Sequence, residues 1–201
     1  FREDGSVIIL GAGRTQFQQI KNQQSKIKNS QMGIEIEKKY RLTKTQLESV
    51  RRRLPRIGAT RQGQQFEENT LYGGRGLAVG RNALRLRRVG DGAFLTYKKR
   101  LPSSSAIKHQ REHETQVDDP EAVNAILGAL GFTPALVYEK RRETWTFGKA
   151  EIVIDELPFG LFMEVEGTER DIRAVETRLG VKNLRAENLS YPQLTLENGK
   201  K

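Results

Sequence analysis

The sequence predicts an α+β fold in which eight antiparallel β-strands close into a barrel, or tunnel, with helices packed outside it. Eight short segments alternate apolar and polar residues, and glycine, proline and aspartate mark the turns between most of them. Inside these segments, charged residues of both signs recur at a spacing of two, which places them on one face of each strand. Eight antiparallel strands are enough to close a barrel.

The strands follow from this alternation. The first begins at Ile34, where isoleucines alternate with glutamates. Turn signals such as Gly73-Gly74 and Gly90-Asp91-Gly92 separate the next runs, and Gly148-Lys149 predicts a hairpin turn near the end. The predicted strands cover residues 34–39, 61–72, 83–89, 93–100, 108–117, 136–147, 151–155 and 161–166.

Two helices are predicted between the strands. Thr43 caps the first and Pro55 ends it. Its expected apolar face consists of Leu47, Val50 and Leu54. Asp119 and Pro120 open the second, and Gly131 lies beyond it. Its expected apolar stripe consists of Val123, Ile126, Leu127 and Leu130.

A third helix is predicted near the end of the chain. It starts near Thr168 and runs to Leu179, and Gly180 follows it. The tail from Asn183 is expected to add one more short packed segment. The length of 201 residues suits one compact domain with a tail.

The beginning of the chain differs from the rest. We predict a disordered or non-native leader over residues 1–31 and a tunnel domain over residues 32–198. The leader is rich in Gln, Asn, Ser and Lys, and strand-like alternation begins only after Met32. Gly11 and Gly13 follow an apolar run, as in a dinucleotide-binding turn. That interpretation is disfavoured because the third glycine and the later acidic residue of the motif are missing.

Composition restricts the chemistry and the partners. Without cysteine, the chain has no disulfides, thiolate zinc sites or thiol nucleophiles, and a cytoplasmic location is the default expectation. No stretch approaches the roughly 20 apolar residues of a membrane-spanning helix, so we expect no membrane association. The formal net charge of +10 indicates a polyanionic partner, such as nucleic acid or a phosphorylated small molecule.

The charged residues that share a strand face form two sets of opposite sign. The carboxylates are Glu35, Glu37, Glu112, Glu114, Asp155, Glu164 and Glu166. The cations are Lys39, Arg85, Arg87, Lys98, Lys140 and Arg142. The pattern alone leaves open whether these residues form a wet outer face or line the inside of the barrel. Chemistry favours the inside, because clustered carboxylates suit Mg²⁺ or Mn²⁺ while arginine and lysine bind phosphate oxygens.

Seven motifs with this parity follow one another in a recognisable order. They are EIEKKY, ALRLRR, LTYKK, REHETQV, VYEKRRETW, VIDELPFG and FMEVEG. In this order the sequence resembles a CYTH domain, of the triphosphate tunnel metalloenzyme superfamily, from Met32 to about Gly180. The resemblance implies a tunnel open at both ends that binds triphosphate-containing substrates together with Mg²⁺ or Mn²⁺.

The resemblance also implies roles for individual residues. The expected phosphate-binding residues are Lys39, Arg85, Arg87, Lys98, Lys140 and Arg142. The expected metal-binding residues are Glu35, Glu37, Asp155, Glu164 and Glu166. Glu112 and Glu114 are expected to position a metal ion or a water molecule. The expected catalytic residues are Glu35, Glu37 and Lys39.

Two reactions fit such a site. We favour a metal-dependent phosphohydrolase acting on inorganic triphosphate, thiamine triphosphate or a nucleoside triphosphate. The alternative is an adenylate cyclase that converts ATP to cyclic AMP and pyrophosphate, because residues 130–160 resemble the corresponding part of the bacterial class IV enzymes. No set of residues in the sequence can be tied to adenine recognition, so hydrolysis is preferred. The sequence leaves open a monomer or a homodimer.

A basic nucleic-acid-binding domain is a third interpretation. Arg51, Arg52 and Arg53 suggest it, but they are expected on the solvent side of the first helix. Aromatic residues make up only 7% of the chain and no base-stacking motif is visible, so this interpretation is disfavoured.

Several other side chains receive a structural assignment. His109 and His113 are expected on the barrel exterior, and Lys99 in solvent. Trp145 and Phe147 are expected in the core beneath the outer helices.

Overall fold

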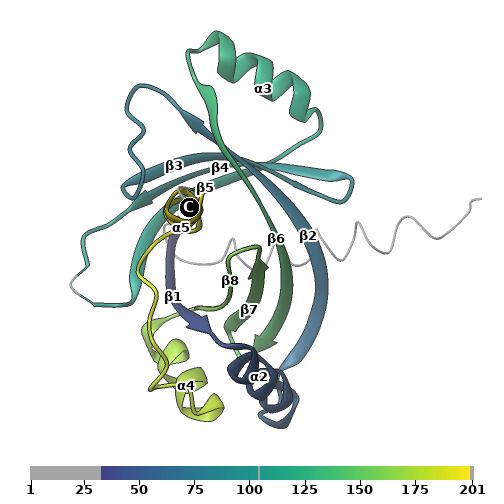
Figure 1. Ribbon diagram of the computed structural model, residues 1–201, viewed down its shortest axis with the longest axis vertical. Helices are drawn as coiled ribbons and strands as arrows, with labels where there is room; N and C mark the ends of the chain where they lie inside the picture. The colour runs from purple at the N-terminus through teal and green to yellow at the C-terminus, as the bar shows by residue number, and fades with distance from the viewer. Residues whose placement is uncertain (1–32, 104, 200–201) are drawn as a thin grey trace, which may run out of the picture. The chain divides into compact units, whose positions relative to one another are not determined.

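The computed structural model describes residues 33–103 and 105–199 and confirms the predicted barrel. Figure 1 shows the strands curving around a common interior. The strands are β1 (Ile34–Leu42), β2 (Thr60–Gly73), β3 (Asn82–Val89), β4 (Gly92–Arg100), β5 (Lys108–Val117), β6 (Thr133–Phe147), β7 (Ala150–Leu157) and β8 (Gly160–Glu166). They close in the order β1-β5-β4-β3-β2-β6-β7-β8, and every neighbouring pair is antiparallel. The predicted leader lies outside the described residues.

Each predicted strand is present, with small shifts at the ends. The largest extensions are three residues each: β1 ends at Leu42 rather than Lys39, and β6 begins at Thr133 rather than Leu136. Thr133 pairs with Gly73, so β6 follows β2 to its very end, past a register shift at Leu71 and Tyr72. Because β2 is long, pairing with it extends β6 to residues that precede its apolar run. Even Pro134 therefore belongs to the strand.

Four helices lie in the described part of the chain: α2 (Lys44–Arg56), α3 (Pro120–Ala129), α4 (Glu169–Leu179) and α5 (Tyr191–Asn198). Thr43 caps α2 as predicted, with its side chain accepting a hydrogen bond from the Gln46 backbone N–H. Gly180 ends α4 in a left-handed conformation that suits glycine, with φ of 65°. Helix α5 confirms the expected packed segment in the tail. No described helix is long and apolar enough to cross a membrane.

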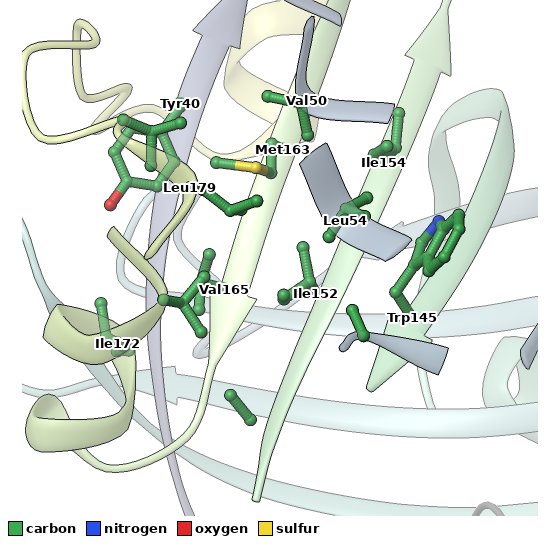
Figure 2. Packing of buried hydrophobic residues seen from close by; sticks show 14 of the residues in the cluster. Tyr40, Val50, Leu54, Trp145, Ile152, Ile154, Met163, Val165, Ile172 and Leu179 are labelled. Atoms are coloured by element: carbon green, nitrogen blue, oxygen red, sulfur yellow. The ribbon is translucent and has the colours of Figure 1, made fainter. Parts of the chain in front are cut away.

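The main apolar core lies between the outer face of the barrel and helices α2 and α4. Figure 2 shows Leu54 of α2 beside Ile152 and Ile154 of β7, and Ile172 of α4 near Val165 of β8. All five side chains are fully buried. Because strand side chains alternate between the two faces, this apolar outer face leaves the intervening residues pointing into the barrel. Trp145 is buried in the same core and Phe147 packs against it, as predicted.

Two helix predictions need correction. Helix α2 does not stop at Pro55 but continues to Arg56, because the backbone N–H of Ile57 still donates to the Arg53 carbonyl at 3.0 Å. In α3, Leu127 is buried and Val123 packs against the same cluster, whereas Ile126 and Leu130 are 56% and 68% exposed. The helix contacts the barrel through one narrow strip, so half of its predicted apolar stripe faces outward.

An ionic network on the barrel exterior joins α2 to the strands around Glu143. The Glu143 carboxylate accepts hydrogen bonds from Arg51 Nε at 2.9 Å, Arg61 Nε at 2.8 Å and Trp145 Nε1 at 3.2 Å. Burial acts to raise the pKa of Glu143, but the hydrogen bonds from Arg61 and Arg51 outweigh it, and the net shift is downward. The ionised carboxylate therefore stabilises the fold.

We expect Glu143→Gln to lower the free energy of unfolding by about 1–2 kcal/mol at pH 7. Because the pKa of Glu143 is lower in the folded state, its ionisation stabilises the fold at pH values above the unfolded-state pKa of about 4.3. This contribution is lost as the pH falls through the folded-state pKa. The difference between variant and wild type should therefore shrink between pH 5 and pH 3. Urea unfolding at several pH values measures it, with the exposed Glu48→Gln as control. Equal destabilisation across this range would contradict the charge argument.

Candidate metal and phosphate site

The predicted charged residues face one common interior. Lys98 Nζ on β4 lies 2.6 Å from Glu35 Oε2 on β1, although β5 separates these strands. Likewise, Arg142 on β6 reaches across β7 and donates to Glu164 on β8 at 2.8 Å. Contacts that span an intervening strand are possible only between side chains on the concave face of the barrel. The structure therefore places both charge sets inside.

Three carboxylates gather at one point of this interior. Oxygen atoms of Glu35, Glu37 and Glu166 lie within 4.8 Å of one another, and we call this group the carboxylate cluster. It forms because Glu35 and Glu37 alternate on β1 and Glu37 is the register partner of Glu166 on β8. Clustered carboxylate oxygens are the donors that Mg²⁺ and Mn²⁺ prefer, so the residues present fit a divalent cation.

Crowding of like charges perturbs the carboxylate cluster. Burial, followed by the nearby Glu151, raises the pKa of Glu166 to about 8. Burial also raises the pKa of Glu35 well above its usual value, although Lys98 acts in the opposite direction. Glu151 is the register partner of Glu166 on β7 and its own pKa is raised, chiefly by burial. A cation at this point would offset the repulsion among these groups.

The other two predicted metal ligands, Asp155 and Glu164, lie among cations instead. Asp155 accepts hydrogen bonds from Arg142 at 2.8 and 2.6 Å, and from Lys140 at 3.2 Å. Glu164 lies 3.2 Å from Lys39 Nζ. Burial acts to raise the pKa of Glu164, but Lys39 and Arg142 hold it well below its usual range. These two carboxylates pair with cations that the sequence predicts to bind phosphate, and they are not members of the carboxylate cluster.

The mid-barrel pair Glu112 and Glu114 also contacts predicted phosphate-binding residues. Lys98 Nζ lies 2.9 Å from Glu112, and Arg87 donates to both oxygens of Glu114 at 3.1 Å. Arg85 lies 3.7 Å from Glu114. Each of these cations thus has an internal partner, which limits the free energy needed to bury the charge.

Sequence reasoning missed several interior residues, which are Glu67, Asn69, Lys108, Glu151 and Tyr191. Lys108 has the parity of Glu112 and Glu114, and Glu151 has the parity of Asp155, so strand alternation could have revealed both. Glu67 stands next to another glutamate on β2, so the sequence does not show which of the two points inward. Tyr191 belongs to α5, for which strand parity gives no signal.

One end of the barrel is filled by the C-terminal segment. A buried apolar group, the closed-end cluster, consists of Leu71, Tyr138, Leu157, Phe162, Tyr191 and Leu194. Leu157 is the last residue of β7, and Tyr191 and Leu194 come from α5. The Tyr191 hydroxyl donates to Asp155 at 2.7 Å, and Lys39 Nζ lies 3.6 Å from the centre of its ring. The tunnel open at both ends, implied by the family resemblance, is therefore closed here by α5.

The three residues that the sequence placed on the barrel exterior or in solvent are found on the outside of the barrel. Lys99 and His113 are exposed. His109 is half-buried on the exterior, where its Nε2 lies 3.4 Å from Glu169 of α4. These side chains have no contact with the carboxylate cluster.

Comparison with known proteins agrees with this geometry. Residues 33–189 match the CYTH domain family. A search of curated proteins found no match. The solved PH1012 protein of Pyrococcus horikoshii is 26% identical, with a TM-score of 0.69 over 80% of this chain and 98% of that chain.

Two further solved structures share the fold. The PH1819 protein of Pyrococcus horikoshii is 27% identical, with a TM-score of 0.65 over 82% of this chain and 99% of that chain. HpAC1 of Hippeastrum, described as an adenylyl cyclase candidate that reveals a dominant triphosphatase activity, is 19% identical. Its TM-score is 0.63 over 82% of this chain and 96% of that chain.

Proposed function

This chain belongs to the CYTH domain family, and we propose that it is a divalent-metal-dependent phosphohydrolase acting on triphosphate-containing substrates. One observation carries the proposal. A single barrel interior holds both the carboxylate cluster and a set of arginines and lysines suited to a phosphate chain. Those cations are Lys39, Arg85, Arg87, Lys98, Lys140 and Arg142, to which the structure adds Lys108.

The cations would bind and position the phosphate chain. They contact interior carboxylates, as in the pairs of Lys98 with Glu35 and of Arg87 with Glu114. An entering phosphate chain would compete for these cations and exchange one anionic partner for another. Because the interior is largely shielded from water, each cation neutralises charge more strongly there than at the surface.

The metal ion would be held by Glu35, Glu37 and Glu166. When bound, Mg²⁺ or Mn²⁺ supplies additional charge neutralisation for the phosphate oxygens during the reaction. Asp155 and Glu164 are separate from the carboxylate cluster. They would keep the cations oriented while the carboxylate cluster holds the metal ion. In hydrolysis, water adds to the terminal phosphorus, the bridging P–O bond breaks, and orthophosphate and the remaining diphosphate leave.

The aromatic side chains of the interior favour hydrolysis over cyclisation. A cyclase must hold the adenine of ATP, typically by stacking or hydrogen bonds. In the described interior, Tyr138, Phe162 and Tyr191 pack within the closed-end cluster, and Phe94 is buried with the Arg87 guanidinium 5.2 Å from its ring centre. None of these rings is free to stack on a base. The HpAC1 description also indicates that a member of this fold can favour triphosphate hydrolysis.

A product assay tests the proposal. We expect the protein to release orthophosphate from inorganic triphosphate, thiamine triphosphate or ATP in the presence of Mg²⁺ or Mn²⁺. Chelation of the metal should abolish turnover, and added metal should restore it, because the carboxylate cluster supplies the donors for the ion. Cyclic AMP and pyrophosphate as the main products from ATP would replace hydrolysis by the cyclase alternative. Full turnover after chelation would contradict the metal site.

A further inference from the structure

Asn69 is an unpartnered amide inside the barrel. Its side chain is fully buried, and neither Nδ2 nor Oδ1 has a hydrogen-bond partner within the described residues. Buried side-chain amides nearly always have partners, because losing water without replacement is unfavourable. We propose that Asn69 is an additional substrate-binding residue, whose amide contacts a phosphoryl group of the triphosphate chain. The proposal rests on the proposed function and assigns a new residue to it.

The register places Asn69 beside the phosphate-binding cations. Asn69 on β2 is the direct partner of Arg87 on β3 and of Tyr138 on β6. Direct partners on neighbouring strands project from the same face, so the Asn69 amide points into the interior. Lys140 lies two residues beyond Tyr138 on β6, on the same strand face and opposite Glu67. Asn69 is therefore flanked by cations on both neighbouring strands.

A neighbouring donor shows the same unfilled hydrogen-bonding capacity. Arg87 Nε is also buried without a hydrogen-bond partner within the described residues, whereas Glu67 Oε2, which likewise makes no hydrogen bond, lies 3.4 Å from Lys140 Nζ. These atoms and the Asn69 amide belong to neighbouring inward-facing positions of β2 and β3. Two of the groups, Arg87 Nε–H and Asn69 Nδ2–H, are donors. A ligand rich in acceptor oxygens would satisfy both, and a phosphoryl group is such a ligand.

The closed-end cluster indicates which part of the chain reaches Asn69. Leu71, two residues further along β2, and Tyr138, the partner of Asn69, both belong to that cluster. The space beyond Asn69 is thus filled by packed apolar side chains. A phosphoryl group bound there has no room on that side for an organic substituent. The geometry assigns Asn69 to the free terminal phosphoryl group, with any organic group directed away from α5.

The test separates binding from folding. Asn69→Leu and Asn69→Ser are compared with wild type for binding of inorganic tripolyphosphate by titration calorimetry, with chelator present so that no turnover occurs. We expect binding to be about 10- to 100-fold weaker in both variants, because a hydrogen bond to a charged group is lost. The ligand-free melting temperature of Asn69→Leu should stay level or rise by about 2–4 °C, since an unpartnered polar group is removed. Thr70→Val, the next residue on the opposite strand face, is the matched control and should bind as wild type does.

The outcomes distinguish this inference from the proposed function. If wild type binds and hydrolyses tripolyphosphate but both Asn69 variants bind it equally well, the assignment of Asn69 is wrong and the function stands. If Asn69→Leu melts well below wild type or does not fold, the amide has a structural role and the inference is also overturned. If wild type neither binds tripolyphosphate in the presence of chelator nor hydrolyses it with added Mn²⁺, both the proposed function and the inference fail.

Discussion

Arg87→Ala is expected to lower the turnover of tripolyphosphate by about 10³-fold. The Arg87 guanidinium lies in the interior, is mostly buried, and contacts Glu114 at 3.1 Å and Glu67 at 3.6 Å. Positioned there, it would neutralise charge that develops on the phosphate oxygens during bond breaking, in a site with little water. Initial rates of orthophosphate release measure the effect.

The fold should survive this substitution because the partners of Arg87 keep other cations or donors. Thr96 Oγ1 donates to Glu114 at 2.6 Å. Lys140 Nζ lies 3.4 Å from Glu67. Neither carboxylate is left buried without a partner, which is the situation that strongly destabilises a protein. The circular dichroism spectrum of Arg87→Ala should therefore match that of wild type.

The neighbouring residue supplies the control. Arg88 follows Arg87 on β3 but points outward, where it contacts Glu68 at 3.5 Å and Glu121 at 3.1 Å. Arg88→Ala removes the same charge and a similar side-chain volume, yet should leave turnover nearly unchanged because surface ion pairs contribute little. Full turnover in a folded Arg87→Ala variant would mean that the phosphate chain does not bind at this wall of the barrel.

Strand alternation in the sequence predicts which residues share the interior, but not which of them meet. A period of two assigns Glu37, Asp155 and Glu166 to the same side of their strands. The distance between them depends on strand register, which the sequence does not show. Glu37 pairs with Glu166, whereas Asp155 pairs with Arg142. For this reason the sequence predicted five metal ligands without distinguishing among them. The structure brings three of these five together.

The closed end of the barrel could not be predicted by the same reasoning. Tyr191 reaches the interior because the chain after α4 returns to the barrel and α5 packs on its inward-facing apolar residues. This is a contact between distant segments, and neither periodicity nor capping signals encode it. Similarly, the apolar spacing in α3 identified the helix correctly but not how much of its surface the barrel covers. Ile126 stays 56% exposed there.

The carboxylate cluster leads to a prediction in which stability and activity change in opposite directions. Glu166 lies beside Glu35 and Glu37 and directly opposite Glu151, and burial together with Glu151 raises its pKa to about 8. Glu166→Gln replaces this carboxyl by a neutral group of nearly the same shape. In the absence of metal we expect the variant to melt at the same temperature as wild type or a higher one. With a pKa of about 8, the wild-type carboxyl must take up a proton on folding at pH 7, or carry a repelled charge above pH 8, and the variant avoids both costs.

Metal binding and turnover should both fall in Glu166→Gln. Loss of one of three carboxylate donors is expected to weaken Mn²⁺ binding by at least about 10²-fold, since even partners outside the ligand set contribute 10- to 100-fold. Turnover of tripolyphosphate should fall by about 10²- to 10³-fold for the same reason. The rise in melting temperature that Mn²⁺ produces in wild type should shrink accordingly. Fluorimetric melting curves with and without Mn²⁺, together with orthophosphate release, measure all three quantities.

The control for this experiment is Glu139→Gln, a matched change at an exposed position on the outer face of β6. It makes the same Glu→Gln replacement outside the barrel and should leave metal binding and turnover as in wild type. If Mn²⁺ raises the melting temperature of Glu166→Gln as much as that of wild type, the ion binds elsewhere. If the metal-free variant is instead markedly less stable than wild type, Glu166 makes a favourable contact that outweighs its repulsion from Glu35, Glu37 and Glu151. The opposite signs in stability and activity thus separate a metal-binding role from a purely structural one.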